Sequence, residues 1–146
     1  MNMKYKPTTT SAIEFSNCDH LEEWVHLFLS NEGNNKALSD GLKLESRKYF
    51  GPIKMNLNLF ERCCGPEEGI KYQIPITSFD SRVNAIMIQY KNGDWDMPPL
   101  IINRFENKYE LNDGNHRFEA LKRLDIHKFW VIIWETVNKN PQRELM

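Results

Sequence analysis

Five consecutive residues, from Asp113 to Arg117, combine an acid, a glycine, an amide and two basic side chains. The residues before them, 109–112, alternate as in a half-buried strand, and apolar residues after them recur at the spacing of a helix. The segment therefore lies where a strand turns into a helix, and Asp113-Gly114 supplies the turn. Such a helix start has free backbone N–H groups and the positive end of the helix dipole, so we expect it to bind phosphate.

Each residue of this segment has a candidate role. Gly114, Asn115, His116 and Arg117 are the candidate phosphate-binding residues, and Asp113 and His116 are the candidate catalytic residues. The carboxylate of Asp113 could hold Mg²⁺ or accept a proton from an attacking hydroxyl. In the simpler interpretation, Asp113 or Asn115 caps the helix, Gly114 relieves backbone strain and Arg117 is a solvated charge. The whole string in this setting favours a functional loop.

The composition predicts one globular domain over residues 1–146, because 40% of the residues are hydrophobic and 27% are charged. No apolar run approaches the length of a membrane span, and residues 1–11 lack the apolar centre of a signal peptide. We therefore expect a cytoplasmic protein without a membrane partner. The cysteines are few, and Cys63-Cys64 has neither metal-ligand spacing nor a nearby histidine, which favours small apolar packing over redox chemistry.

The charge balance disfavours nucleic acid as a partner. The formal net charge is -1, whereas DNA binding depends on neutralising phosphates with a broad basic surface. The longest basic cluster, Lys122-Arg123 near Arg117, also fits an ordinary solvated helix face.

Hydrophobic periodicity predicts the helices. They cover residues 21–29 with Asp19 and Glu22 as a capping pair, a weaker helix over 36–49, one that begins at Ser78 or Asp80, and the helix after the motif.

Alternation and short apolar runs predict the strands. They cover residues 55–59, 70–76, a hairpin of 100–102 with 109–112, and 128–135 in the interior of the sheet. The loop over residues 61–69 carries Arg62, Glu67 and Glu68, which fit the rim of an active site and a plain surface hairpin equally well.

The order of these elements over residues 70–136 resembles the ParB/sulfiredoxin superfamily. The specific pieces are Ile74-Pro75-Ile76, Pro98-Pro99-Leu100-Ile101-Ile102 and the Asp113-Gly114-Asn115-His116-Arg117 box followed by Glu119-Ala120-Leu121. The resemblance implies an α+β fold in which a small mixed sheet packs with helices, plus an N-terminal helical extension. It divides the chain into an extension over residues 1–52, a core over 53–136 and a tail over 137–146.

The resemblance also implies roles for residues. In ParB proteins the corresponding box binds the triphosphate of a nucleotide, and in sulfiredoxins a basic residue on the preceding helix, near the place of Arg82, contacts nucleotide. Sulfiredoxins carry their repair cysteine where this chain has Asn115, so we expect no sulfiredoxin activity. The ADP-dependent free serine kinases of the superfamily use an Asp-Gly box like Asp113-Gly114 in phosphoryl transfer. ParB partition proteins continue into a helix-turn-helix, which this sequence lacks, so we do not expect centromere binding.

The leading hypothesis is a nucleotide-binding phosphotransferase or phosphohydrolase, such as an ATP- or ADP-dependent kinase or a nucleotide hydrolase. Its ligands would be ATP or ADP, with CTP as an alternative, together with Mg²⁺ and a small-molecule or protein acceptor. Two alternatives remain open: a non-enzymatic nucleotide-responsive binding module, and a ParB-like DNA-binding or nuclease protein.

Overall fold

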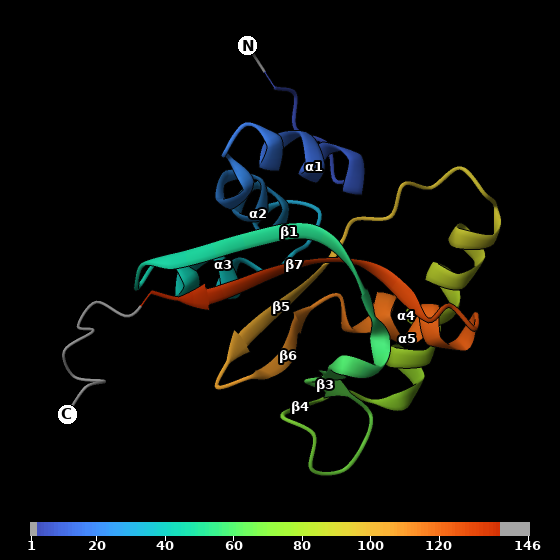
Figure 1. Ribbon diagram of the computed structural model, residues 1–146. Coiled ribbons are helices and arrows are strands. Elements are labelled where there is room, and N and C mark those ends of the chain that lie inside the picture. The colour runs from blue at the N-terminus through green and yellow to red at the C-terminus, as the bar shows by residue number, and fades with distance from the viewer. Residues whose placement is uncertain (1–2, 138–146) are drawn as a thin grey trace.

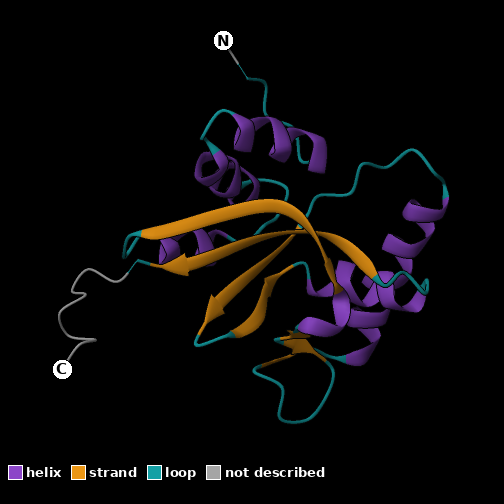
Figure 2. Ribbon diagram, in the orientation of Figure 1, coloured by secondary structure: helices purple, strands orange, loops and turns teal. Residues whose placement is uncertain are grey.

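The computed structural model describes residues 3–137, which fold around a five-stranded mixed sheet with helices packed on both faces (Figures 1 and 2). The strands lie in the order β1 (Arg47–Asn56), β7 (Lys128–Thr136), β5 (Leu100–Phe105), β6 (Lys108–Asp113) and β2 (Glu61–Arg62). β1 runs antiparallel to β7 and β5 antiparallel to β6, whereas β7 is parallel to β5 and β2 is parallel to β6. The predicted α+β class is therefore confirmed by the sheet and its helices.

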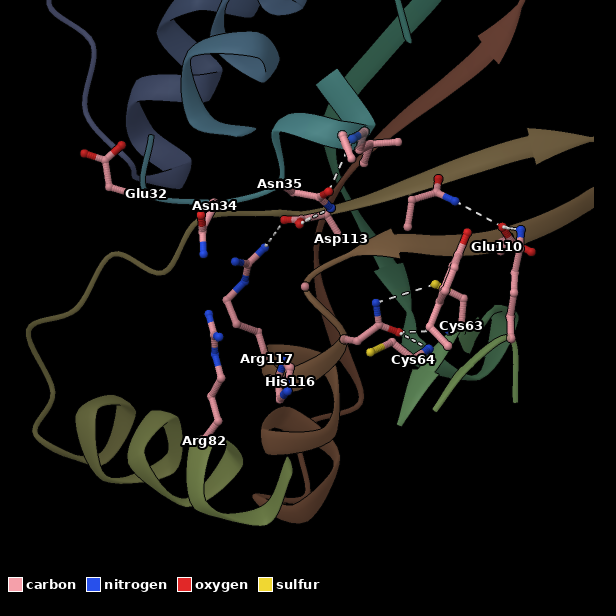
Figure 3. A pocket seen from close by; sticks show the side chains of 18 of the residues that line it. Glu32, Asn34, Asn35, Cys63, Cys64, Arg82, Glu110, Asp113, His116 and Arg117 are labelled. Carbon is pink, nitrogen blue, oxygen red and sulfur yellow. Dashed lines mark hydrogen bonds and ion pairs between the residues drawn. The ribbon is translucent and has the colours of Figure 1, made fainter. Parts of the chain in front are cut away.

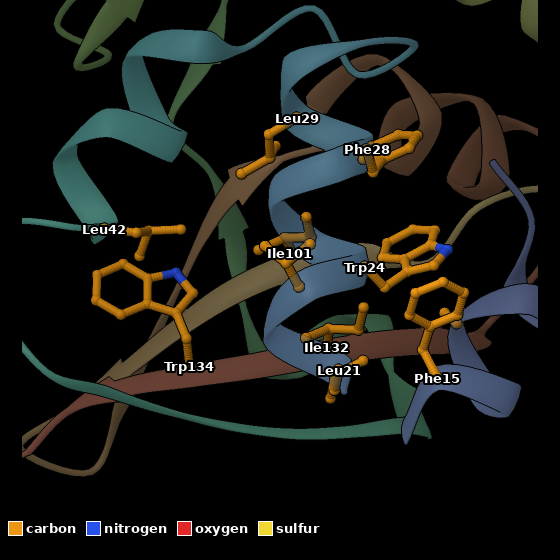
Figure 4. Close-up of a cluster of buried hydrophobic side chains, with 11 residues drawn as sticks. Phe15, Leu21, Trp24, Phe28, Leu29, Leu42, Ile101, Ile132 and Trp134 are labelled. Carbon is orange, nitrogen blue, oxygen red and sulfur yellow. The ribbon is translucent and has the colours of Figure 1, made fainter. Parts of the chain in front are cut away.

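The N-terminal helices cover one face of the sheet. They are α1 (Thr9–Asn17), α2 (Leu21–Ser30) and α3 (Lys36–Leu42). Trp24 and Phe28 of α2 are fully buried and stack with their ring centroids 5.1 Å apart. They belong to the same cluster as Ile101 of β5 and Ile132 of β7, so the helices and the sheet share one core (Figure 4).

The opposite face of the sheet is covered by α5 (Asn115–Arg123), whose Phe118 and Leu121 pack against it. This face uses the residues that alternate with those of the first core, such as Ile102 and Ile133, as the pleat of a strand requires. α4 (Ile76–Lys91) then packs on α5 through Phe79, Val83 and Ala120.

A short second sheet lies beside β2. It pairs β3 (Cys64–Gly65) with β4 (Tyr72–Gln73) in parallel and follows a single 3₁₀ turn, η1 (Leu57–Leu59). Tyr72 of β4 donates its backbone N–H to the carbonyl of Cys63 over 2.9 Å. This bond and the β3–β4 pairing hold the two ends of the loop between these strands together.

Four secondary-structure predictions need correction. The helix predicted over residues 36–49 ends at Leu42, because the chain enters β1 at Arg47. The strand predicted over 55–59 holds only the end of β1, and Leu57–Leu59 forms the 3₁₀ turn. The strand predicted over 70–76 shrinks to Tyr72–Gln73. Pro75 is the N-cap of α4, so this helix begins earlier than Ser78.

The N-terminal part holds two further differences. α1 was not predicted, and it begins with Thr8 as an N-cap whose side chain accepts from the backbone N–H of Ser11. α2 begins after His20 without a side-chain cap, and Asp19 has a φ of 61°, so the predicted Asp19–Glu22 capping pair is wrong. The hairpin, the interior strand and the helix after the motif are confirmed as β5–β6, β7 and α5. Apart from Val137, the predicted tail over 137–146 lies outside the described residues.

Candidate functional site

A cavity of about 620 Å³ opens at the N-terminus of α5 (Figure 3). Four parts of the chain enclose it: the segment from the end of α2 through α3, the loop with β3 and β4, helix α4, and the β6–α5 junction. Its charged and polar lining residues are Glu32, Asn34, Asn35, Cys63, Cys64, Lys71, Tyr72, Arg82, Glu110, Asn112, Asp113, Asn115, His116 and Arg117. The predicted motif and the N-terminal helical region therefore border the same cavity.

Gly114 gives the helix start an unobstructed backbone. It is the N-cap of α5 with a φ of 97°, a left-handed conformation that favours glycine, and it provides no capping side chain. A Cβ at this position would lie 2.7 Å from Leu100 Cδ2 and 2.8 Å from Arg117 Nη2. The backbone N–H groups of the first turn have no partner within the helix, so they are available to an anion in the cavity.

Asp113 and Arg117 form a buried ion pair behind this helix start. Arg117 Nη2 lies 3.5 Å from Asp113 Oδ2 and donates to the carbonyl of Pro99 over 3.1 Å, while its guanidinium lies 5.3 Å from the ring centroid of Phe28. Asp113 Oδ1 accepts from Asn35 Nδ2 over 3.0 Å. Within residues 3–137, Asp113 Oδ2 and Arg117 Nε are buried without a hydrogen-bond partner.

Burial decides the ionisation tendencies of this pair. It raises the pKa of the Asp113 carboxyl, although Arg117 and Asn35 oppose the rise, because a charged carboxylate loses its hydration there. It also lowers the pKa of Arg117, while Asp113 opposes that change. Much of the charge of Arg117 is therefore directed at Asp113 rather than at the cavity.

Asn115 uses its side chain to hold the cysteine loop. Its Oδ1 accepts from the backbone N–H groups of Cys63 (2.9 Å) and Cys64 (3.1 Å), and its Nδ2 lies 3.7 Å from Cys63 Sγ. Asn115 is only 7% exposed, so its amide is committed to these contacts. A contact between Asn115 and phosphate would therefore come from its backbone N–H.

His116 is a neutral imidazole at neutral pH. Burial first, and then the charges of Arg82, Arg117 and Arg62, lower its pKa to about 4. Its ring packs against that of Phe79, with the centroids 5.0 Å apart. The same surroundings that repel a proton from His116 attract an anion.

Arg82 is the cation that the cavity leaves free. It projects from α4, is exposed, and has no carboxylate within ion-pair distance among the described residues. Figure 3 shows Arg82 on the same side of the cavity as Arg117 and His116. The structure thus brings the predicted Arg82 together with the motif.

The predicted rim residues lie beside the cavity rather than on its lining. Arg62 pairs with Glu67, lies 3.3 Å from Glu119 through its Nε, and covers the ring of Phe79 at 4.9 Å. Glu68 is exposed. The adjacent Cys63 and Cys64 line the cavity instead, both as free thiols whose pKa is raised by burial.

Sequence reasoning missed the opposite walls. Asn34 and Asn35 follow α2 in a segment rich in Asn and Gly, a composition that marked a loop but gave no clue to what it contacts. Lys71 directly precedes β4, Tyr72 is the first residue of β4, and Glu110 lies on β6. In the sequence, the polar residues that alternate along 109–112 were the one indication that a face of this strand borders a polar cavity.

The residues do not form a site for Mg²⁺ held by the protein alone. Across residues 3–137, no group of three His, Cys, Asp or Glu side chains is placed to hold a metal ion. Asp113 Oδ1 accepts from Asn35, and its Oδ2 lies at ion-pair distance from Arg117 without a hydrogen bond. Among the described residues, Asp113 therefore has no set of neighbouring ligands with which to hold Mg²⁺.

The chain matches no protein-family model and no curated protein. In the described range, no helix is long and apolar enough to cross a membrane. Among solved structures, it is similar to a sulfiredoxin from Arabidopsis thaliana, with 15% sequence identity and a TM-score of 0.42 over 64% of this chain and 96% of that chain. A likeness at this level carries no argument about superfamily, ligand or activity, so these stay predictions from the sequence.

Proposed function

We propose that this protein binds a nucleotide by its phosphate groups at the N-terminus of α5. The proposal rests on one observation. Helix α5 begins without a side-chain cap, and its first residues line a cavity that the unpaired cation Arg82 also lines. A helix N-terminus favours anions through its free N–H groups and its dipole, and a guanidinium adds charge-assisted hydrogen bonds to phosphate. The buried, unpartnered atoms at the Asp113–Arg117 pair mark the same place as a polar site.

Each residue of the site would have its own role in binding phosphate. The backbone N–H groups of Asn115 and His116 would donate to phosphate oxygens, and Arg82 would neutralise their charge. The neutral His116 ring would donate from one nitrogen, and a bound anion would raise its pKa. Arg117 would hold the turn and Asp113 in place, because its guanidinium already contacts Asp113, Pro99 and Phe28.

The proposal is tested by calorimetry with pyrophosphate, ADP, ATP and CTP, each with and without Mg²⁺. Arg82→Gln removes the free charge, so we expect about tenfold or more weaker binding of every phosphate ligand. Arg104→Gln is the matched control, since Arg104 pairs with Glu135 away from this cavity. Equal affinity in the wild type and the Arg82→Gln variant, or no phosphate binding by the wild type, would overturn the proposal.

A second candidate is phosphoryl transfer from the bound nucleotide to water or to a small-molecule or protein hydroxyl. Asp113 favours it, because the residue lines the cavity and burial raises the pKa of its carboxyl, which suits a group that accepts a proton and returns it. The oxygen of the attacking hydroxyl would bond to phosphorus while Asp113 takes the proton of that hydroxyl. The bond from phosphorus to the leaving nucleotide oxygen would break.

Phosphate release and ³¹P NMR distinguish this candidate from binding alone. If Asp113→Asn keeps nucleotide affinity but loses turnover, the transfer reaction is supported. If the wild type binds nucleotide and shows no turnover with water or with a panel of hydroxyl acceptors, the protein is a nucleotide-responsive binding module.

A further inference from the structure

An exposed aromatic side chain borders the cavity at β4. Tyr72 is 58% exposed, although large aromatic side chains are more often buried. It lines the cavity together with Lys71, whose Nζ lies 5.6 Å from the centre of the ring. One cation near the ring leaves most of this side chain open to a ligand.

Two hydrogen bonds, one within the backbone and one to a side chain of α5, fix the position of Tyr72 relative to α5. Its N–H donates to the carbonyl of Cys63 over 2.9 Å, and the N–H of Cys63 donates to Oδ1 of Asn115 over 2.9 Å. Asn115 is the first residue of α5. Two successive hydrogen bonds therefore connect Tyr72 to the first residue of α5, where phosphate is proposed to bind.

The polar side chains around Tyr72 are already engaged with one another. Glu110 Oε1 lies 3.4 Å from Lys71 Nζ and accepts from Asn112 Nδ2 over 3.1 Å. Asn112 Oδ1 in turn accepts from Trp134 Nε1 over 2.9 Å. Tyr72 has Lys71 Nζ over its ring and is 58% exposed, so part of the ring remains accessible to a ligand.

We propose that Tyr72 is the stacking platform for the base of the bound nucleotide. This inference rests on the proposed phosphate site and adds a binding site for the base of the same nucleotide. Stacking on an aromatic ring accepts any base, because every base has a π face. The cavity would therefore prefer a nucleotide over inorganic phosphates while discriminating weakly among bases.

The test compares ADP with pyrophosphate, because both carry two phosphates and only ADP carries a base. Calorimetry is performed on the wild type, Tyr72→Ala, Tyr72→Phe and Phe105→Ala, the last being an exposed aromatic that lines no part of this cavity. We expect wild-type ADP affinity about tenfold or more above pyrophosphate affinity. Tyr72→Ala should lower the affinity for ADP to that for pyrophosphate and leave the affinity for pyrophosphate unchanged. Tyr72→Phe and Phe105→Ala should bind both ligands with wild-type affinity.

The outcomes separate the two proposals. If Tyr72→Ala leaves the ratio of the two affinities unchanged, or weakens both ligands equally, the platform is overturned while the phosphate site stands. If the wild type binds neither ligand, the proposed function itself fails, and the platform fails with it.

Discussion

Asn35 and Asp113 are 78 positions apart in sequence, yet Asn35 Nδ2 donates to Asp113 Oδ1 over 3.0 Å. Asn35 precedes α3 and Asp113 ends β6, so this bond joins the N-terminal helical region to the start of the candidate phosphate site. The N-terminal region is thereby a wall of the cavity as well as a cover for the sheet.

Asn35→Ser tests that bond. Serine keeps the N-cap of α3 but is too short to replace the amide, so Oδ1 of the buried Asp113 loses its partner. We expect the free energy of unfolding to fall by about 1–3 kcal/mol, measured by urea denaturation. Asn84→Ser, at an exposed position of α4, is the control, and a loss no larger than that of the control would contradict the role of Asn35.

Arg117→Met tests the buried ion pair. It leaves the Asp113 carboxylate buried without its charge partner, which we expect to lower the free energy of unfolding by about 3–5 kcal/mol. The double variant Asp113→Asn/Arg117→Met removes both charges, so it should be more stable than Arg117→Met alone. Strict additivity of the two substitutions in a double-mutant cycle would show that the two side chains are not coupled.

Gly114→Ala tests the conformation of the turn. Alanine costs about 1–2 kcal/mol at a left-handed φ, and here its Cβ would also collide with Leu100 and Arg117. Gly93→Ala is a matched control, because Gly93 has a φ of 95° with no neighbour within 4 Å of the added Cβ. Thermal or urea unfolding should show the larger loss for Gly114→Ala, and equal losses would rule out the close packing.

The lowered pKa of His116 predicts that the stability of the protein depends on pH. Its pKa falls from 6.5 in the unfolded chain to about 4 in the folded protein, so the unfolded chain binds more protons between these values. The contribution of His116 to stability is therefore complete above pH 6.5 and is lost as the pH falls towards 4. His116→Gln should flatten the stability profile in this window, measured by urea denaturation at a series of pH values, and a profile as steep as that of the wild type would contradict the role of His116.

The elements that sequence predicted well have strong periodicity of their own. α2 has a stripe of apolar residues every three or four positions, and β7 is a continuous apolar run, so both could be located without knowing their partners. β1 could not, because its burial follows no clean alternation and it is stabilised by pairing along most of its length with β7, about 80 residues away.

The same contrast holds for the candidate site. The Asp113–Arg117 segment was found because a turn, a strand and a helix meet within a few residues. Asn35 and Tyr72 were missed because their positions depend on contacts with Asp113 and Cys63, which local sequence does not encode. The buried orientation of Arg117 towards Phe28 was likewise invisible, since it requires the N-terminal helices to be packed in place.

An NMR titration of the ¹⁵N-labelled protein with pyrophosphate would locate the bound anion residue by residue. If phosphate binds at the N-terminus of α5, the largest saturable shifts will be those of the backbone amides of Asn115, His116 and Arg117, and Arg82→Gln will weaken the apparent affinity. Saturable shifts centred elsewhere, with these three amides unmoved, would contradict the account.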